Sequence, residues 1–66
     1  MLVKDLYYGY FITEENIGNN MTIYRIYDIL KAEYVFNNIP TIKECKKIIE
    51  RIERGYENAI YVINHI

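Results

Sequence analysis

The side chains in this sequence that could perform chemistry are few, and their spacing does not assemble a catalytic centre. Cys45 could act as a nucleophile, but the one histidine, His65, lies twenty positions further along the chain. Cys45 also falls on the apolar side of an expected helix, where a free cysteine packs as a small hydrophobic residue. One cysteine and one histidine do not supply the four ligands of a structural zinc site. We therefore expect Cys45 in the core, His65 in a solvated tail, and neither a metal nor a cofactor.

Two pairs of carboxylates could in principle serve acid–base or magnesium chemistry. Glu14 and Glu15 are neighbours within 14–20, a stretch with the composition of a solvated polar loop. Asp5 and Asp28 are the other pair, and no histidine lies near either pair in the sequence. The sequence therefore predicts a protein that is not an enzyme, with Glu14 and Glu15 as part of an acidic contact surface.

Three short segments that alternate apolar and polar residues predict the strands that position these side chains. They are residues 6–13, 21–28 and 32–37, and short connections between them favour an antiparallel meander. In the second segment, Ile26 and Tyr24 share one face, which favours that face as the buried one and leaves Arg25 in solvent.

A helix is predicted over residues 41–54. Thr41 and Glu44 have the spacing of a capping box, and Pro40 disfavours helix in the residue before it. Apolar residues then recur at helical spacing, and Gly55 is a residue that commonly ends a helix. The stripe consists of Ile42, Cys45, Ile48, Ile49 and Ile52.

The remaining C-terminal segment fits two structures. Residues 59–64 are β-branched and aromatic, which favours a fourth strand. The 3–4 spacing of the helix also continues through Tyr56, Ala59 and Ile63, which is typical of one long C-terminal helix with an overhanging seam for self-pairing. We expect a single α+β domain over 1–66, in the order β-β-β-α-β, with the strand favoured over the long helix. The expected core is Ile12, Ile26, Phe36, Ile42, Cys45, Ile49 and Ile52.

Composition narrows the classes of function. The chain has 66 residues, 52% of them hydrophobic, and a net charge of −1, so no strong field marks nucleic acid or an anionic membrane as the partner. Its single cysteine suits a reducing compartment, and its first residues lack the pattern of a signal peptide. We expect a cytoplasmic protein that does not enter a membrane. Because a domain this small is marginally stable and has no disulfide, a homodimer is also an expectation.

Surface chemistry suggests two kinds of partner. Eight tyrosines exceed what so small a core needs, so some must decorate the sheet, and tyrosine and arginine favour protein contacts. The candidate contacts for a protein partner are Tyr24, Arg25 and Tyr27, together with Glu14 and Glu15. The alternative partner is nucleic acid, bound by the cations of the helix, which are Lys43, Lys46, Lys47, Arg51 and Arg54.

One stretch of the chain resembles a known group of proteins. Tyr24-Arg25-Ile26-Tyr27-Asp28, then Tyr34-Val35-Phe36, then 41–49 (Thr-Ile-Lys-Glu-Cys-Lys-Lys-Ile-Ile) resemble small orphan proteins of phages and mobile elements, in which a β-meander leads into a capped helix. The resemblance covers about residues 21–54 and carries no chemical motif. Some proteins of this size and style are antagonists of host defence, anti-CRISPR proteins among them. The resemblance therefore implies one class to consider, a phage or mobile-element inhibitor that blocks a host protein by stoichiometric binding, and it assigns no role to any residue.

Overall fold

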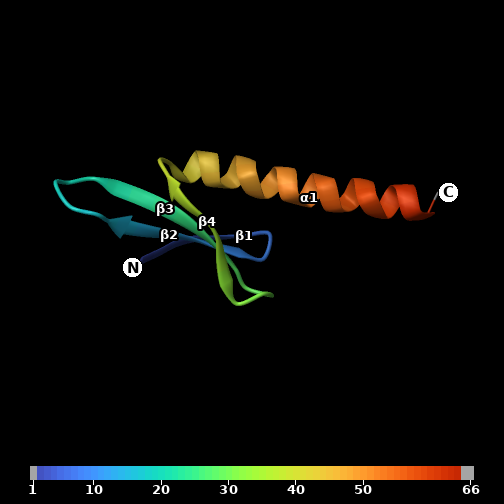
Figure 1. Cartoon of the computed structure of the whole chain (residues 1–66), viewed down its shortest axis with the longest axis horizontal. Coiled ribbons are helices and arrows are strands. Elements are labelled where there is room, and N and C mark those ends of the chain that lie inside the picture. The colour runs from blue at the N-terminus through green and yellow to red at the C-terminus, as the bar shows by residue number, and fades with distance from the viewer. Residues whose placement is uncertain (1, 65–66) are drawn as a thin grey trace.

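The computed structural model of the protein consists of a four-stranded antiparallel sheet followed by one helix (Figure 1). It describes the backbone of residues 2–64 and the side chains of residues 2–55. The elements are β1 (Leu2–Tyr7), β2 (Tyr10–Asn16), β3 (Thr22–Asp28), β4 (Glu33–Ile39) and α1 (Ile42–Asn64). Each strand pairs with the next in the chain, so the predicted α+β class and antiparallel meander are confirmed.

The predicted strand 6–13 is in fact two strands joined by a tight hairpin. Tyr8 and Gly9 form its turn with φ angles of 50° and 80°, and Tyr7 pairs with Tyr10 on either side of it. A two-residue turn with positive φ at both central positions matches the twist of paired strands. The first hairpin therefore closes at Gly9, which had been expected to lie inside one continuous strand.

A bulge at Lys4 shapes β1. Val3 pairs with Thr13 and Asp5 pairs with Ile12, so Lys4 is an extra residue without a partner in the register. Because of the extra residue, Val3 and Asp5 lie on opposite faces of the sheet although they are two positions apart. Next to the bulge, Asp5 Oδ1 accepts a hydrogen bond of 2.8 Å from the backbone N–H of Leu6.

The helix is longer than the favoured prediction and matches the alternative. Residues 59–64 do not form a strand, because α1 runs unbroken through Gly55 to Asn64, and the fourth strand of the sheet is β1 instead. A glycine inside a helix costs only about 1 kcal/mol, so Gly55 does not have to end it. The continuous 3–4 spacing of apolar residues outweighed the strand propensity of this segment. His65 lies outside the described residues.

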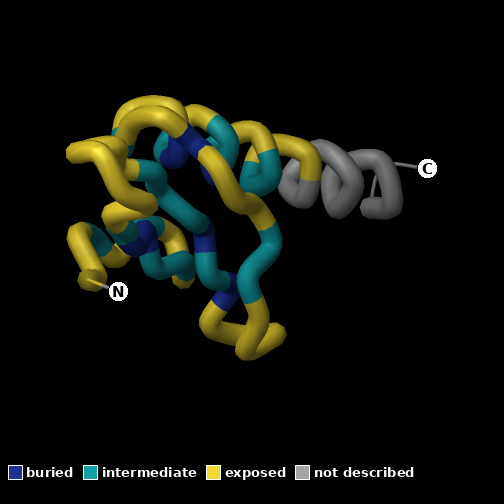
Figure 2. Tube along the Cα trace, turned by 60° about the vertical axis from the view of Figure 1, so that its left-hand side comes forward, coloured by how far each residue is buried: buried dark blue, intermediate teal, exposed yellow. Residues whose placement is uncertain are grey.

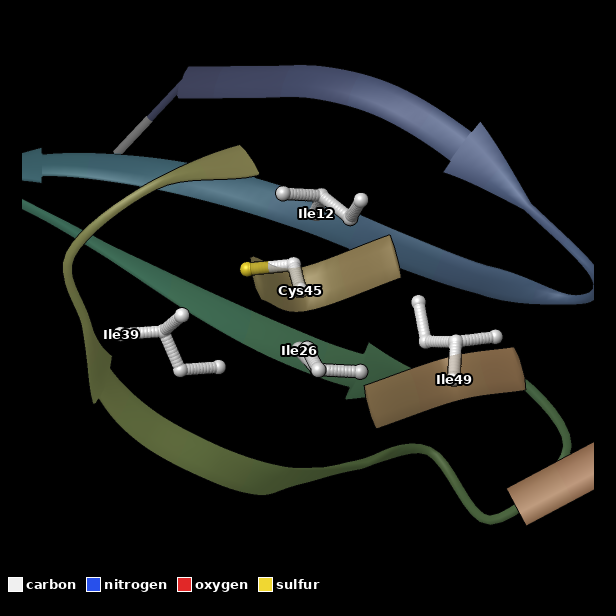
Figure 3. Close-up of a cluster of buried hydrophobic side chains, with 5 residues drawn as sticks. All are labelled: Ile12, Ile26, Ile39, Cys45 and Ile49. Carbon is white, nitrogen blue, oxygen red and sulfur yellow. The ribbon is translucent and has the colours of Figure 1, made fainter. Parts of the chain in front are cut away.

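The core lies between α1 and one face of the sheet (Figure 3), and its buried side chains are Ile12, Ile26, Ile39, Cys45 and Ile49. Four of them were predicted, and Ile42 and Ile52 of the predicted set are half-buried. The prediction for Phe36 is wrong, since this residue is 40% exposed. The register of β4 shifts on both sides of Ile26, and Val35 packs against the core next to Phe36.

The start of α1 carries the Thr41 half of the predicted capping box. The Thr41 hydroxyl accepts a hydrogen bond of 3.1 Å from the backbone N–H of Glu44, and the Thr41 carbonyl accepts one of 3.2 Å from Cys45. Such a cap satisfies an amide at the helix start that has no partner inside the helix. The cap places Cys45 and Ile49 directly over the sheet.

Candidate binding face of the sheet

Because α1 covers only one face of the sheet, the other face is left open (Figure 1). Residues directly opposite each other on paired strands share a face. Phe11 pairs with Tyr27, which pairs with Tyr34; Val3 pairs with Thr13, which pairs with Arg25. None of these residues belongs to the cluster under α1. We call this surface the open face, and it consists of Val3, Phe11, Thr13, Arg25, Tyr27 and Tyr34.

Three aromatic rings cross the open face from β2 to β4. The rings of Phe11 and Tyr27 are stacked with centroids 6.3 Å apart, and those of Tyr27 and Tyr34 meet edge to face at 5.1 Å. Val3 and Thr13 complete a shallow hollow of about 310 Å³ beside the rings. Both arrangements are ones that aromatic pairs prefer, so the rings support one another in place. The result is a preorganised apolar surface on three adjacent strands.

Arg25 borders this aromatic row and is held from two sides. Its Nη2 lies 2.6 Å from Glu15 Oε2, and its guanidinium carbon lies 5.7 Å from the centroid of the Tyr34 ring. About a third of each ion-pair side chain is exposed, 33% for Arg25 and 36% for Glu15. The ion pair and the ring contact together fix the guanidinium at the border of the hollow, where it can meet a partner in a defined position.

The structure separates the five predicted contacts into two groups. Arg25, Tyr27 and Glu15 belong to the open side of the sheet, whereas Tyr24 packs against the core on the side of α1. The Tyr24 hydroxyl donates a hydrogen bond of 3.2 Å to Glu14 Oε2, and Lys4 Nζ lies 3.7 Å from the same oxygen. Burial, and then the bond to Glu14, raises the pKa of Tyr24. Neighbours in a strand point to opposite faces, which explains the division.

The loop that was predicted over residues 14–20 begins later, at residue 17, so the two glutamates are not part of it. Glu14 and Glu15 belong to β2, and the connection between β2 and β3 is the stretch 17–21. Its entry is shaped by Asn16, whose Oδ1 accepts a hydrogen bond of 2.8 Å from the backbone N–H of Gly18. Both glutamates therefore hold side chains of the sheet in place rather than extending from a loop.

The cations of the helix also fall into two groups, those that contact the rest of the chain and those that are exposed. Lys46 lies 3.1 Å from Asp5 Oδ2 and 5.2 Å from the centroid of the Tyr7 ring, so it attaches α1 to β1. This contact with Lys46 lowers the pKa of Asp5. Lys47 lies 3.7 Å from Glu44 on the helix surface. The cations whose residues are exposed are Lys43, Lys47, Arg51 and Arg54.

The remaining candidates for chemistry, Cys45 and Asp28, have roles in the fold. Cys45 is fully buried, and burial raises the pKa of its thiol to about 11, which suppresses the nucleophilic thiolate. Asp28 Oδ1 accepts a hydrogen bond of 3.1 Å from the backbone N–H of Lys31 and so shapes the turn after β3. Among the described residues, no three His, Cys, Asp or Glu side chains gather as a metal site would require. Within the same part of the chain, no helix has the length and apolar character needed to cross a membrane.

Residues that sequence reasoning missed, Thr13 among them, make up four of the six positions of the open face. Val3, Phe11 and Tyr34 join Tyr27 and Arg25 there through the strand register. Alternation along β3 alone places Arg25 and Tyr27 together, but the partners across the sheet depend on the hairpin and the bulges. Comparison of the chain with known protein families, curated proteins and solved structures finds no match.

Proposed function

We propose that the protein is a non-enzymatic binding protein that attaches to a partner protein through the open face. The observation that carries this proposal is the row formed by Phe11, Tyr27 and Tyr34 on a sheet face that α1 leaves uncovered. Fixed aromatic rings with an arginine beside them are the composition that dominates binding energy in protein interfaces. Rings that are already ordered lose little entropy on binding.

The chemistry of this surface indicates the partner's contact surface. The hollow beside the rings suits an apolar side chain, and the Arg25–Glu15 pair at its border suits polar groups around it. Before α1, five acidic residues outnumber three basic ones, a net charge of −2 for residues 1–41. A contact surface on the partner that has an apolar centre and weakly basic residues around it would complement the open face.

A binding protein of this kind would act by occupying its partner rather than by turning over a substrate. This mode agrees with the class that the sequence resemblance implies, in which a small phage or mobile-element protein blocks a host defence protein. Support comes from the size of the chain and the fixed geometry of the open face, since a rigid surface is enough to block a partner.

Replacing Tyr27 by alanine tests the proposal, because this ring contacts both other rings of the row. The protein is used to capture its partner from a bacterial lysate, and the purified pair is then measured by titration calorimetry. We expect one partner per chain and an affinity at least about 30-fold lower for Tyr27→Ala, a loss of about 2 kcal/mol typical of a central contact.

Tyr8→Ala is the matched control, since Tyr8 is 64% exposed and lies in the first hairpin, away from the open face. Its affinity should equal that of the unmodified protein, and circular dichroism should show all three proteins folded. A folded Tyr27→Ala protein that binds as tightly as the unmodified protein would remove the open face as the binding site.

Nucleic acid is a second candidate ligand, favoured by the four exposed cations on α1, Lys43, Lys47, Arg51 and Arg54. Four phosphate contacts would make the affinity for generic DNA or RNA fall about 100-fold between 50 and 200 mM salt. Fluorescence anisotropy with a labelled oligonucleotide measures this. Absence of binding at the lower salt concentration would eliminate the candidate.

A further inference from the structure

We infer that the projecting half of α1 pairs with a second copy of this chain across a two-fold axis. The helix has 23 residues and is therefore about 35 Å long. The fully buried residues that join it to the sheet, Cys45 and Ile49, lie in its first eight positions. Beyond the sheet the helix continues past the turn between β1 and β2 and the turn between β3 and β4 (Figure 1). The longest dimension of the molecule is 53 Å, against 20 and 15 Å for the others.

The exposed area of the chain is too large for a compact monomer. The accessible surface is 5129 Å² for a mass of 8.0 kDa. A compact monomer of that mass exposes about 4,450 Å², so the excess is about 700 Å². Each partner in a standard protein–protein interface buries about 800 Å². The excess is therefore close to one subunit's share of a stable dimer interface.

Exposed apolar residues gather where the helix leaves the sheet. Leu30, in the turn between β3 and β4, is 96% exposed, and its neighbour Ile29 is 40% exposed. Figure 2 shows that the exposed parts of the chain are mostly its turns and edges. Leu30 lines a hollow together with Tyr10, Ile52 and Glu53. We call this surface the hairpin corner, and it consists of Tyr10, Ile29, Leu30 and Ile52. An apolar leucine at a turn, almost fully in water, stabilises nothing within its own chain.

The sequence of α1 supplies a matching surface. Its apolar 3–4 spacing runs on from Ile52 through Tyr56, Ala59 and Ile63, beyond the last residue that faces the sheet. In a two-fold arrangement, the projecting half of each helix would lie along the other and reach the other chain's hairpin corner. The combined surface of helix stripe and hairpin corner then meets the same combined surface of the copy, which closes the assembly at two chains.

A second copy is the occupant that these features favour. Ile52 belongs both to the apolar stripe of α1 and to the hairpin corner, so one antiparallel contact would cover both. A chain of 66 residues with one cysteine has no disulfide to stabilise it, and association is a usual substitute. The open face lies on the other side of the sheet and takes no part, so a dimer would carry two binding faces.

Sedimentation equilibrium of the full chain over a dilution series tests the inference. We expect a mass of twice 8.0 kDa at high concentration, falling toward 8.0 kDa on dilution. Leu30→Glu should weaken self-association at least about 10-fold, because it places a charge in an apolar contact. The fold should be unchanged, since Leu30 is 96% exposed and buries almost no apolar surface within the chain.

Ile17→Glu is the matched control. Ile17 is 52% exposed and lies in the connection between β2 and β3, at the opposite end of the molecule from the projecting helix (Figure 1). This variant should dimerise as the unmodified protein does. A monomer at every concentration would overturn the inference, and so would equal effects of the two substitutions. Partner binding through the open face is a separate measurement and can succeed or fail independently.

Discussion

Ile49→Ala is expected to lower the free energy of unfolding by about 2–5 kcal/mol, the usual cost of emptying a buried isoleucine site. Ile49 is one of four fully buried hydrophobic residues in the described part of the chain. A chain of 66 residues has a total stability of about 3–10 kcal/mol by the usual value per residue. The expected loss is therefore a large share of the total stability, because α1 loses one of its two fully buried anchors on the sheet.

Urea unfolding followed by circular dichroism measures this loss, with Arg51→Ala as the control. Arg51 lies two positions further along the same helix and is exposed, so its replacement should change stability by less than about 0.5 kcal/mol. If Ile49→Ala cost no more than Arg51→Ala, the helix would not be packed on the sheet as described.

The stability of the protein is expected to fall between pH 9 and pH 11 because of Cys45. Burial raises the pKa of this thiol from 9.0 to about 11. In that interval the unfolded chain has lost the thiol proton and the folded chain retains it. Unfolding therefore releases a proton, and stability falls by about 1.4 kcal/mol for each pH unit. Below pH 9 the thiol is protonated in both states, so its full contribution is present there.

Cys45→Ala separates this effect from that of the tyrosines. Burial also raises the pKa of Tyr7, Tyr10 and Tyr24, so some loss of stability at high pH will remain in the variant. The quantity to compare is the slope of unfolding free energy against pH, which should be shallower in Cys45→Ala. Identical slopes for the two proteins would mean that the thiol is solvated in the folded state.

The parts of the fold that were predictable depend on local signals. The cap at Thr41, the apolar stripe through Cys45 and Ile49, and the alternation along β3 are each set by neighbouring residues, and the structure contains all three. β1 was missed because the bulge at Lys4 breaks its alternation and because Tyr-Gly is not a usual hairpin dipeptide. The end of α1 was uncertain because strand propensity and helical spacing compete in one segment.

The candidate site was predictable only in part, because contacts across the sheet depend on residues that are far apart in the sequence. Alternation places Arg25 and Tyr27 on one face of β3 and Tyr24 on the other. A prediction based on residue type alone therefore groups three side chains that lie on opposite faces of the sheet. Phe11 and Tyr34 join Tyr27 only through long-range register. That register depends on a turn and several bulges, none of which leaves a clear pattern along the chain.

The hydrogen bond from Leu6 to Asp5 has a consequence for the behaviour of the protein at high concentration. A chain with thirteen isoleucines and eight tyrosines carries a hazard of fibril growth, in which sheets extend by recruiting further copies edge to edge. Growth along β1 needs its outward amides, but the Leu6 amide is already satisfied within the chain and the bulge twists the strand beside it. Polymerisation along this edge is thereby opposed, even where the protein is concentrated.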